Sequence, residues 1–106
     1  MIKYKASVQL QGLQVQMLIA LIQVSDFSRL NNDVVIFVTS ALDGSHSAKS
    51  LHYAGAALDL DIPGPPELNQ ALAAHLSTSL PLDYDVVNEG SHVHIEWQPR
   101  CRARGS

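Results

Sequence analysis

The chain has 106 residues, of which 46% are apolar and 16% charged, and its net charge is −3 with histidine neutral. This balance predicts one folded domain rather than a disordered segment, and it argues against general nucleic-acid binding. The single cysteine, Cys101, excludes an internal disulfide. We expect the domain to span residues 1–99, followed by a basic flexible tail at 100–106.

The first third of the chain predicts a helix that ends in a turn. Apolar side chains recur every three or four residues, as on one face of a helix, and further apolar residues widen that face. We expect this helix to be covered in a core against a sheet, not to form an oligomer or membrane surface. Residues 25–28 should end it, and residues 31–33 should form a turn. The apolar positions are Leu10, Leu13, Met17, Leu21 and Val24, widened by Val15, Leu18, Ile19 and Ile22.

Two strands separated by a polar loop are predicted next. Residues 34–38 are apolar and mostly β-branched without alternation, which indicates a central strand covered on both faces. Residues 39–49 are polar, and such a loop is a natural segment to line a site. Residues 56–62 alternate, with Leu58, Leu60 and Ile62 toward the core and Ala57, Asp59 and Asp61 on the other face.

The second half continues with a helix and two more strands. Pro66 and Glu67 suit a first helical turn, and an apolar stripe follows from Leu68 to Leu76, with His75 as a packed or boundary histidine. Residues 84–88 and 92–97 are predicted strands joined by a tight turn. We therefore predict an α+β domain with a small, mostly antiparallel sheet and two helices.

The N-terminal region predicts neither a signal peptide nor a membrane span. The apolar run from Val15 to Val24 is interrupted by Gln16 and Gln23 and is too short to cross a bilayer. We expect synthesis in the cytoplasm and no membrane partner. The oligomeric state stays open, with a monomer favoured.

Two short stretches hold groups suited to bind one zinc ion. A catalytic zinc takes three protein ligands and keeps one position for water, and His52, Asp59 and His94 form such a set. His52 and Asp59 can reach one ion only if the chain doubles back, which Gly55 permits. His94 joins them if its strand pairs beside the Asp59 strand with the polar faces aligned.

A base beside the zinc must carry the proton from water to the leaving amine. His92 shares the strand face of His94, and Glu89 lies in the turn before it. Either residue, or the two as a pair, could fill this role. An exposed polar strand face without a metal is the simpler alternative for this stretch.

At these residues the chain resembles the superfamily of zinc D-alanyl-D-alanine carboxypeptidases, murein endopeptidases, phage endolysin peptidases and the hedgehog signalling domain. Their shared pattern is Ser-x-His-x-x-Gly-x-Ala-x-Asp, followed by His-x-His or Glu-x-x-His. The second half is present as His92-x-His94, with Glu89 five residues before His94. The first half is complete in Ser50, His52, Gly55, Ala57 and Asp59.

The resemblance implies a hedgehog or D,D-peptidase type of fold, with zinc at His52, Asp59 and His94. It implies a metallopeptidase that hydrolyses peptide bonds in peptidoglycan stem peptides, with His92 or Glu89 as the general base. The small size is most like phage-encoded members, and release on lysis or carriage in a virion would bring such a protein to the cell wall.

The loop after the first predicted strand lacks an arginine that the peptidases of this superfamily carry to stabilise the oxyanion. His46 or Lys49 could substitute as a cation, and with Ser50 they are the expected substrate contacts. The alternative function is a zinc-stabilised module that binds a wall peptide or a partner protein without cleaving it. A further alternative is a metal-free structural subunit.

Overall fold

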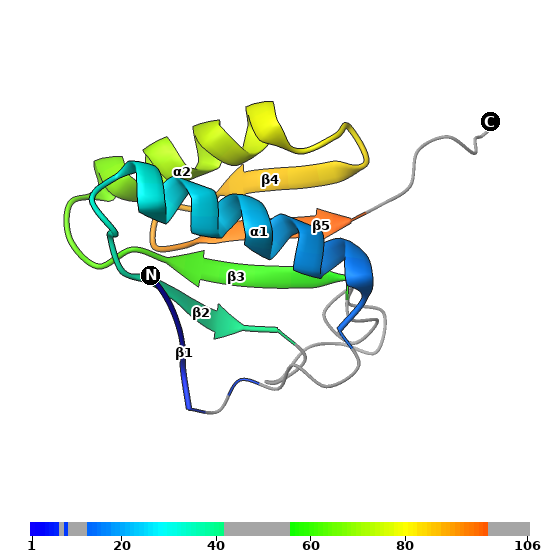
Figure 1. Ribbon diagram of the computed structural model, residues 1–106, viewed down its shortest axis with the longest axis horizontal. Helices are drawn as coiled ribbons and strands as arrows, with labels where there is room; N and C mark the ends of the chain where they lie inside the picture. Colours follow the sequence, from blue (N-terminus) through cyan, green and yellow to red (C-terminus); the bar gives the residue numbers. More distant parts are fainter. Residues whose placement is uncertain (7, 9–12, 42–55, 98–106) are drawn as a thin grey trace, which may run out of the picture.

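A computed structural model describes residues 1–6, 8, 13–41 and 56–97 (Figure 1). This part of the chain forms one sheet with strand order β1-β2-β3-β5-β4, in which β1 runs parallel to β2 and the other pairings are antiparallel. The predicted α+β domain with a mostly antiparallel sheet and two helices is therefore confirmed. The elements are β1 (Ile2–Tyr4), α1 (Val15–Leu30), β2 (Ile36–Ser40), β3 (Ala57–Asp61), α2 (Pro66–Ser79), β4 (Tyr84–Asn88) and β5 (Val93–Trp97).

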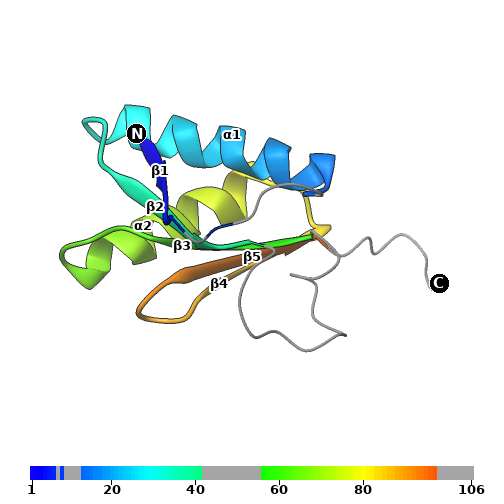
Figure 2. The same ribbon diagram turned by 90° about the horizontal axis from the view of Figure 1, so that it is seen from below.

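Both helices lie on the same face of the sheet (Figure 2), and together with that face they enclose the core. The strand residues that point toward the helices are fully buried, because alternate side chains of a strand share one face. The core therefore leaves the opposite face of β3 and β5 for polar groups. The buried strand residues are Ile36, Val38, Leu58, Leu60, Val93 and Ile95.

Strand β1 was not predicted from the sequence. It has three residues and lies at the edge of the sheet, where it pairs Ile2 with Ile36 and Tyr4 with Val38. A segment this short shows no alternation that could separate it from a loop. Its position follows from pairing with β2, a contact between residues more than thirty positions apart in the chain.

Helix α1 begins later and ends later than the sequence predicts. It runs from Val15 to Leu30, so the predicted end at residues 25–28 is wrong. Phe27 and Ser28 are buried, and this packing keeps the last turn helical despite its polar residues. The Asn31 side chain then donates a hydrogen bond to the Phe27 carbonyl (2.8 Å), and the turn at residues 31–33 is confirmed.

A stripe of apolar side chains on α1 is exposed, contrary to the sequence prediction. Its members are 45–61% exposed, and no described residue covers them. The sheet and α2 contact the other side of the helix, around Met17, Leu21 and Val24. The sequence predicted that the whole apolar face of α1 would be covered, but the described elements cover only part of it. The stripe consists of Val15, Leu18, Ile19 and Ile22.

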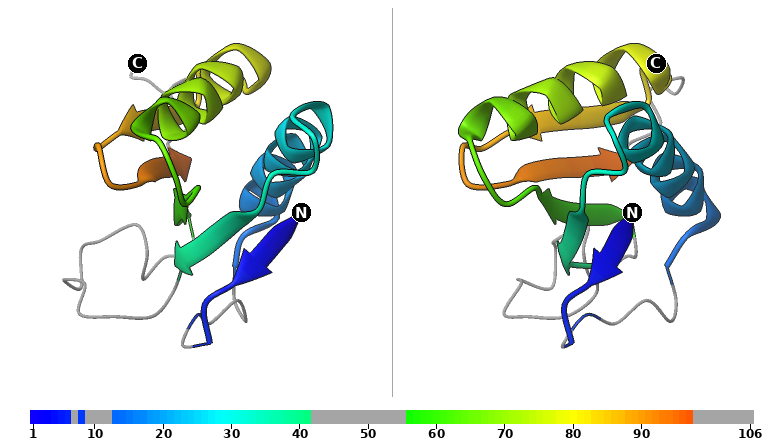
Figure 3. Two further views of the ribbon diagram at one scale, coloured as in Figure 1. Left: turned by 90° about the vertical axis from the view of Figure 1, so that its left-hand side faces the viewer. Right: turned by 60° about the vertical axis from the view of Figure 1, so that its left-hand side comes forward.

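Strand β2 is covered less completely than predicted. Ile36 and Val38 are fully buried under the helices, whereas Phe37 and Thr39 on the opposite face are partly exposed. In the described part of the chain the helices lie on one face only, as Figure 3 shows from two sides. The prediction of a strand covered equally on both faces is therefore wrong for these residues.

Helix α2 agrees with the sequence in its start, its apolar stripe and its histidine. Pro66 occupies the first turn, and Leu72 and Leu76 are fully buried. His75 is half-buried and stacks at a tilt on Phe27 of α1, with ring centroids 5.5 Å apart. This confirms the packed histidine. No helix in the described ranges is long and apolar enough to cross a membrane.

Candidate functional site

The pairing of β3 with β5 places Asp59 directly opposite His94. Their side chains point away from the helices, and His94 Nδ1 lies 2.7 Å from Asp59 Oδ1. The zinc hypothesis requires these strands to pair with their polar faces aligned, and the observed register meets this condition. Two of the three predicted zinc ligands are thus in contact, although they are 35 positions apart in the chain.

The hairpin between β4 and β5 brings Glu89 onto His92. His92 Nε2 lies 2.7 Å from Glu89 Oε1, and the Glu89 N–H donates to the His92 carbonyl (2.9 Å) to close the turn. Gly90 takes a φ of +89° between them, a backbone conformation that disfavours other residues. The two proposed proton carriers therefore form a pair, because the turn folds one back on the other.

His92 also faces the predicted metal ligands. Its Nε2 lies 3.9 Å from Asp59 Oδ1, and its Nδ1 lies 3.0 Å from the Ser91 hydroxyl. One ring nitrogen is held by Ser91, while the other lies between Glu89 and Asp59. This orientation directs Nε2 toward the side of the site where Asp59 and His94 meet.

Glu96 holds the second nitrogen of His94, a contact that we did not predict from the sequence. His94 Nε2 lies 2.7 Å from Glu96 Oε1, and the His94 side chain is only 17% exposed. The hydrogen bond to Asp59, together with the contact with Glu96, raises the pKa of His94 to about 9, although burial of the ring acts to lower it. Period-two alternation puts Glu96 on the same face as His92 and His94, which is the signal that could have identified it.

The groups around His94 fit a zinc ligand set in their chemistry. A ligating histidine binds the metal through one ring nitrogen and gives its other N–H to a carboxylate, as His94 can with Asp59 on one side and Glu96 on the other. Zinc also accepts a carboxylate oxygen such as that of Asp59. Within the described residues, no three histidine, cysteine or acidic side chains are arranged to hold a metal. The described part of the chain contains two of the three predicted ligands, Asp59 and His94.

Several predicted site residues lie outside the described part of the chain. They include the third zinc ligand, His52, and Gly55, which permits its return toward Asp59. The expected substrate contacts Ser50, His46 and Lys49 belong to the same stretch, and the predicted tail from residue 100 also falls outside. These assignments stay predictions.

Within the described residues, the sheet face opposite the helices is rich in acidic side chains. Asp85 lies opposite Glu96 in the pairing of β4 with β5, and like charges placed opposite each other destabilise a sheet unless a cation offsets them. The described lysines, Lys3 and Lys5, lie on or directly after β1, at the other edge of the sheet from β4. This charge pattern favours cationic ligands. The carboxylates are Asp59, Asp61, Asp85, Glu89 and Glu96.

No protein-family model matches this chain, and no curated protein sequence matches it. The resemblance to zinc peptidases therefore stays a prediction from the motif residues.

Proposed function

We propose that the chain is a zinc-dependent peptidase of the D,D-carboxypeptidase or endopeptidase type, which hydrolyses peptide bonds in peptidoglycan stem peptides. The observation that carries this proposal is the contact of Asp59 with His94 (2.7 Å) beside the pair of His92 and Glu89 (2.7 Å), on the sheet face opposite the helices. The order of helices and strands is also compatible with a hedgehog or D,D-peptidase type of fold, which is part of the proposal.

The metal would be held by His94, Asp59 and His52. Zinc, when bound, supplies an acidified water and a Lewis acid for the peptide carbonyl. His94 would bind through Nδ1, the nitrogen that faces Asp59, while Glu96 keeps the ring in place through Nε2. Because His94 must be neutral to bind a metal, its raised pKa makes metal binding compete with a proton.

His92 and Glu89 would carry the proton. The carboxylate of Glu89 orients the His92 ring and stabilises the imidazolium that forms when His92 accepts a proton. His92 then gives this proton to the nitrogen of the leaving amine. The 2.7 Å contact makes the two residues one functional unit, so removal of either should impair proton transfer.

Zinc content and peptide cleavage test the proposal. Purified protein should carry about one zinc per chain and release new fragments from muropeptides, detected by mass spectrometry, and a chelator should abolish the release. Asp59→Asn should lose zinc, whereas Asp26→Asn should keep it, because Asp26 forms only a surface ion pair with Arg29 on α1. Full zinc binding and activity in His94→Ala would reject the ligand assignment.

A zinc-stabilised module that binds a wall peptide or partner protein without cleavage is the second candidate. One observation favours it: the described lysines lie at the far edge of the sheet from β4, so neither of them is placed to stabilise an oxyanion at this site. Measurable binding of muropeptides to the zinc-loaded protein with no new fragments would support this function.

A further inference from the structure

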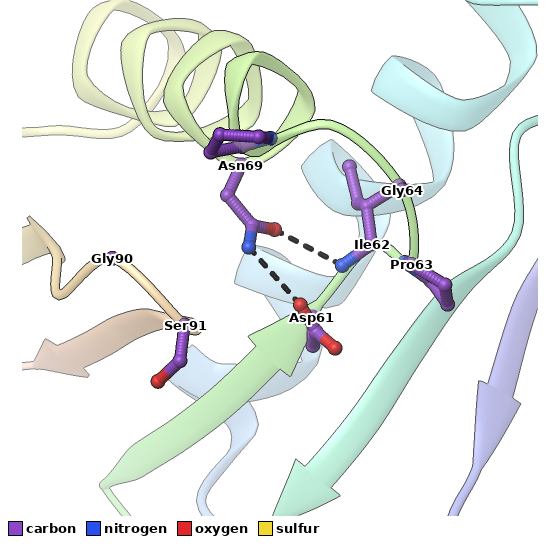
Figure 4. A pocket seen from close by; sticks show the side chains of 8 residues that line it. Asp61, Ile62, Pro63, Gly64, Asn69, Gly90 and Ser91 are labelled. Carbon is purple, nitrogen blue, oxygen red and sulfur yellow. Dashed lines mark hydrogen bonds between the residues drawn. The ribbon is translucent and has the colours of Figure 1, made fainter.

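A pocket of about 190 Å³ lies near the candidate catalytic groups, and Figure 4 shows the residues that line it. It lies where β3 ends, between the start of α2 and the β4–β5 hairpin. Because a water molecule occupies about 30 Å³ in the liquid, the pocket has room for several waters or for one aliphatic side chain. Pro63, Pro66 and Ile62 form its apolar part, and Asp61, Asn69 and Ser91 form its polar part.

Asp61 is held in a fixed orientation at this pocket. Asn69, which is only 3% exposed, donates a hydrogen bond from Nδ2 to Asp61 Oδ1 (3.0 Å). The amide oxygen of Asn69 in turn accepts the Ile62 N–H (3.0 Å), which determines which end of the amide faces Asp61. Figure 4 shows the other carboxylate oxygen of Asp61 turned away from Asn69. The carboxylate therefore keeps acceptor capacity for a ligand, and no described cation forms an ion pair with it.

The pocket adjoins the groups that would perform hydrolysis. Asp61 follows Asp59 by two residues, so both side chains lie on the same face of β3, about 7 Å apart along the strand. Ser91 lines the pocket and also contacts Nδ1 of His92 (3.0 Å). A peptide bound at His92 would therefore place a neighbouring side chain within reach of the pocket.

We propose that this pocket is a subsite for a primary ammonium group on the peptide substrate, such as the side chain of a diamino acid. This assignment rests on the proposed function for the peptide bond beside it. The ammonium binds the carboxylate of Asp61 and the hydroxyl of Ser91, while its aliphatic stem packs on the prolines. A substrate carboxylate is disfavoured here, because Asp61 and the neighbouring acidic residues repel it.

Two of the residues that line the pocket are glycines with positive φ. Gly64 and Gly90 have φ angles of +125° and +89°, which side chains rarely adopt. A Cβ at Gly64 would also approach Leu68 Cδ1 to 3.4 Å. Neither residue adds a side chain to the lining, so a ligand can approach their backbone closely.

A pair of small probes tests the subsite without any cleavage. Nα-acetyl-L-lysine methylamide and its norleucine analogue share the aliphatic stem, but the norleucine side chain ends without the ammonium group and adds no bulk. NMR titration of the full chain gives the Kd of each from the Asn69 side-chain amide signals. We expect the free amine to bind at least about tenfold more tightly, the effect of one charge-assisted hydrogen bond. Equal binding of the two probes would overturn the subsite even if the protein cleaves peptides.

Three variants connect this preference to the pocket. Asp61→Asn keeps an oxygen for Asn69 but removes the charge, so it should reduce the preference to less than about twofold. Ser91→Ala, in the exposed hairpin turn, should reduce it in part. Glu67→Gln removes a carboxylate one residue from Pro66 and should leave the preference unchanged. A preference that survives in Asp61→Asn would place the ammonium elsewhere. Because none of these measurements needs turnover, loss of the peptidase proposal would not produce the same result.

Discussion

Zinc affinity should rise steeply with pH between 7 and 9, because His94 must lose a proton to bind the metal. Contacts with Asp59 and Glu96 raise the pKa of this imidazole to about 9. At pH 7 only about one His94 side chain in a hundred is then neutral, and each pH unit increases that fraction about tenfold. Half of the His94 side chains are neutral at pH 9, so the apparent affinity should increase about 50-fold from pH 7 to pH 9. An imidazole with the ordinary pKa of about 6.5 would add little above pH 7.

The variant Glu96→Gln separates the two roles of Glu96. It preserves a hydrogen-bond acceptor for His94 Nε2 but removes a negative charge that raises the pKa of His94. The steep region should move to lower pH, because less alkaline conditions are needed to deprotonate the ring. At pH 9 the variant should bind zinc more weakly, by about 10–100-fold, as found when the carboxylate partner of a ligating histidine is removed.

Competition with a chromophoric chelator at pH 7, 8 and 9 measures the affinity directly. Calorimetry at pH 7 in two buffers of different ionisation enthalpy counts the protons, and we expect about one proton released per zinc. Asp26→Asn is the matched control, since its carboxylate lies on α1 in a surface ion pair. A change of less than about threefold between pH 7 and 9, with no proton release, would refute the assignment of His94 as a ligand with a raised pKa.

Three predictions concern stability. In the metal-free protein the pKa of His94 is about 9 in the folded state and 6.5 in the unfolded state. Protonated His94 therefore stabilises the fold fully below pH 6.5, and this contribution is lost as the pH rises to 9. The free energy of unfolding, measured by urea denaturation, should decrease by up to about 3 kcal/mol over this interval, and the decrease should be absent in His94→Asn. Leu60→Ala in the core should cost about 2–5 kcal/mol, against less than about 0.5 kcal/mol for the exposed Leu82→Ala. Gly90→Ala should cost about 1–2 kcal/mol by thermal or urea denaturation, from its φ of +89° alone, since no atom lies within 4 Å of the added Cβ.

The elements near the candidate site were well predicted because their signals are local. Alternation over residues 56–62 and 92–97 identified both strands and the polar face that carries Asp59 and His94. A hydrophobic pattern sets which side of a strand is buried, so it also limits the registers in which two strands can pair. The observed pairing of Asp59 with His94 is one that satisfies both patterns.

The predictions that failed depended on what covers each element. The stripe of α1 that includes Leu18 and Ile22 has helical spacing, but periodicity does not reveal how much of a face a neighbour can cover. The end of α1 was placed too early, because the burial of Phe27 and Ser28 outweighs the low helix propensity of their segment. Alternation along residues 92–97 puts Glu96 on the same face as His94, but its contact with His94 Nε2 depends on the positions of both side chains in the folded protein.

The sequence by itself determined the order of the main strands and helices, the polar faces and the residue types able to bind a metal, because these follow from neighbouring residues. Tertiary structure decided the contact of Asp59 with His94, the raised pKa of His94 and the pocket at Asp61. Each of these requires strands and helices distant in the chain to come together. The distances between these side chains, their burial and the electrostatic effects on their pKa values are set only when the chain has folded.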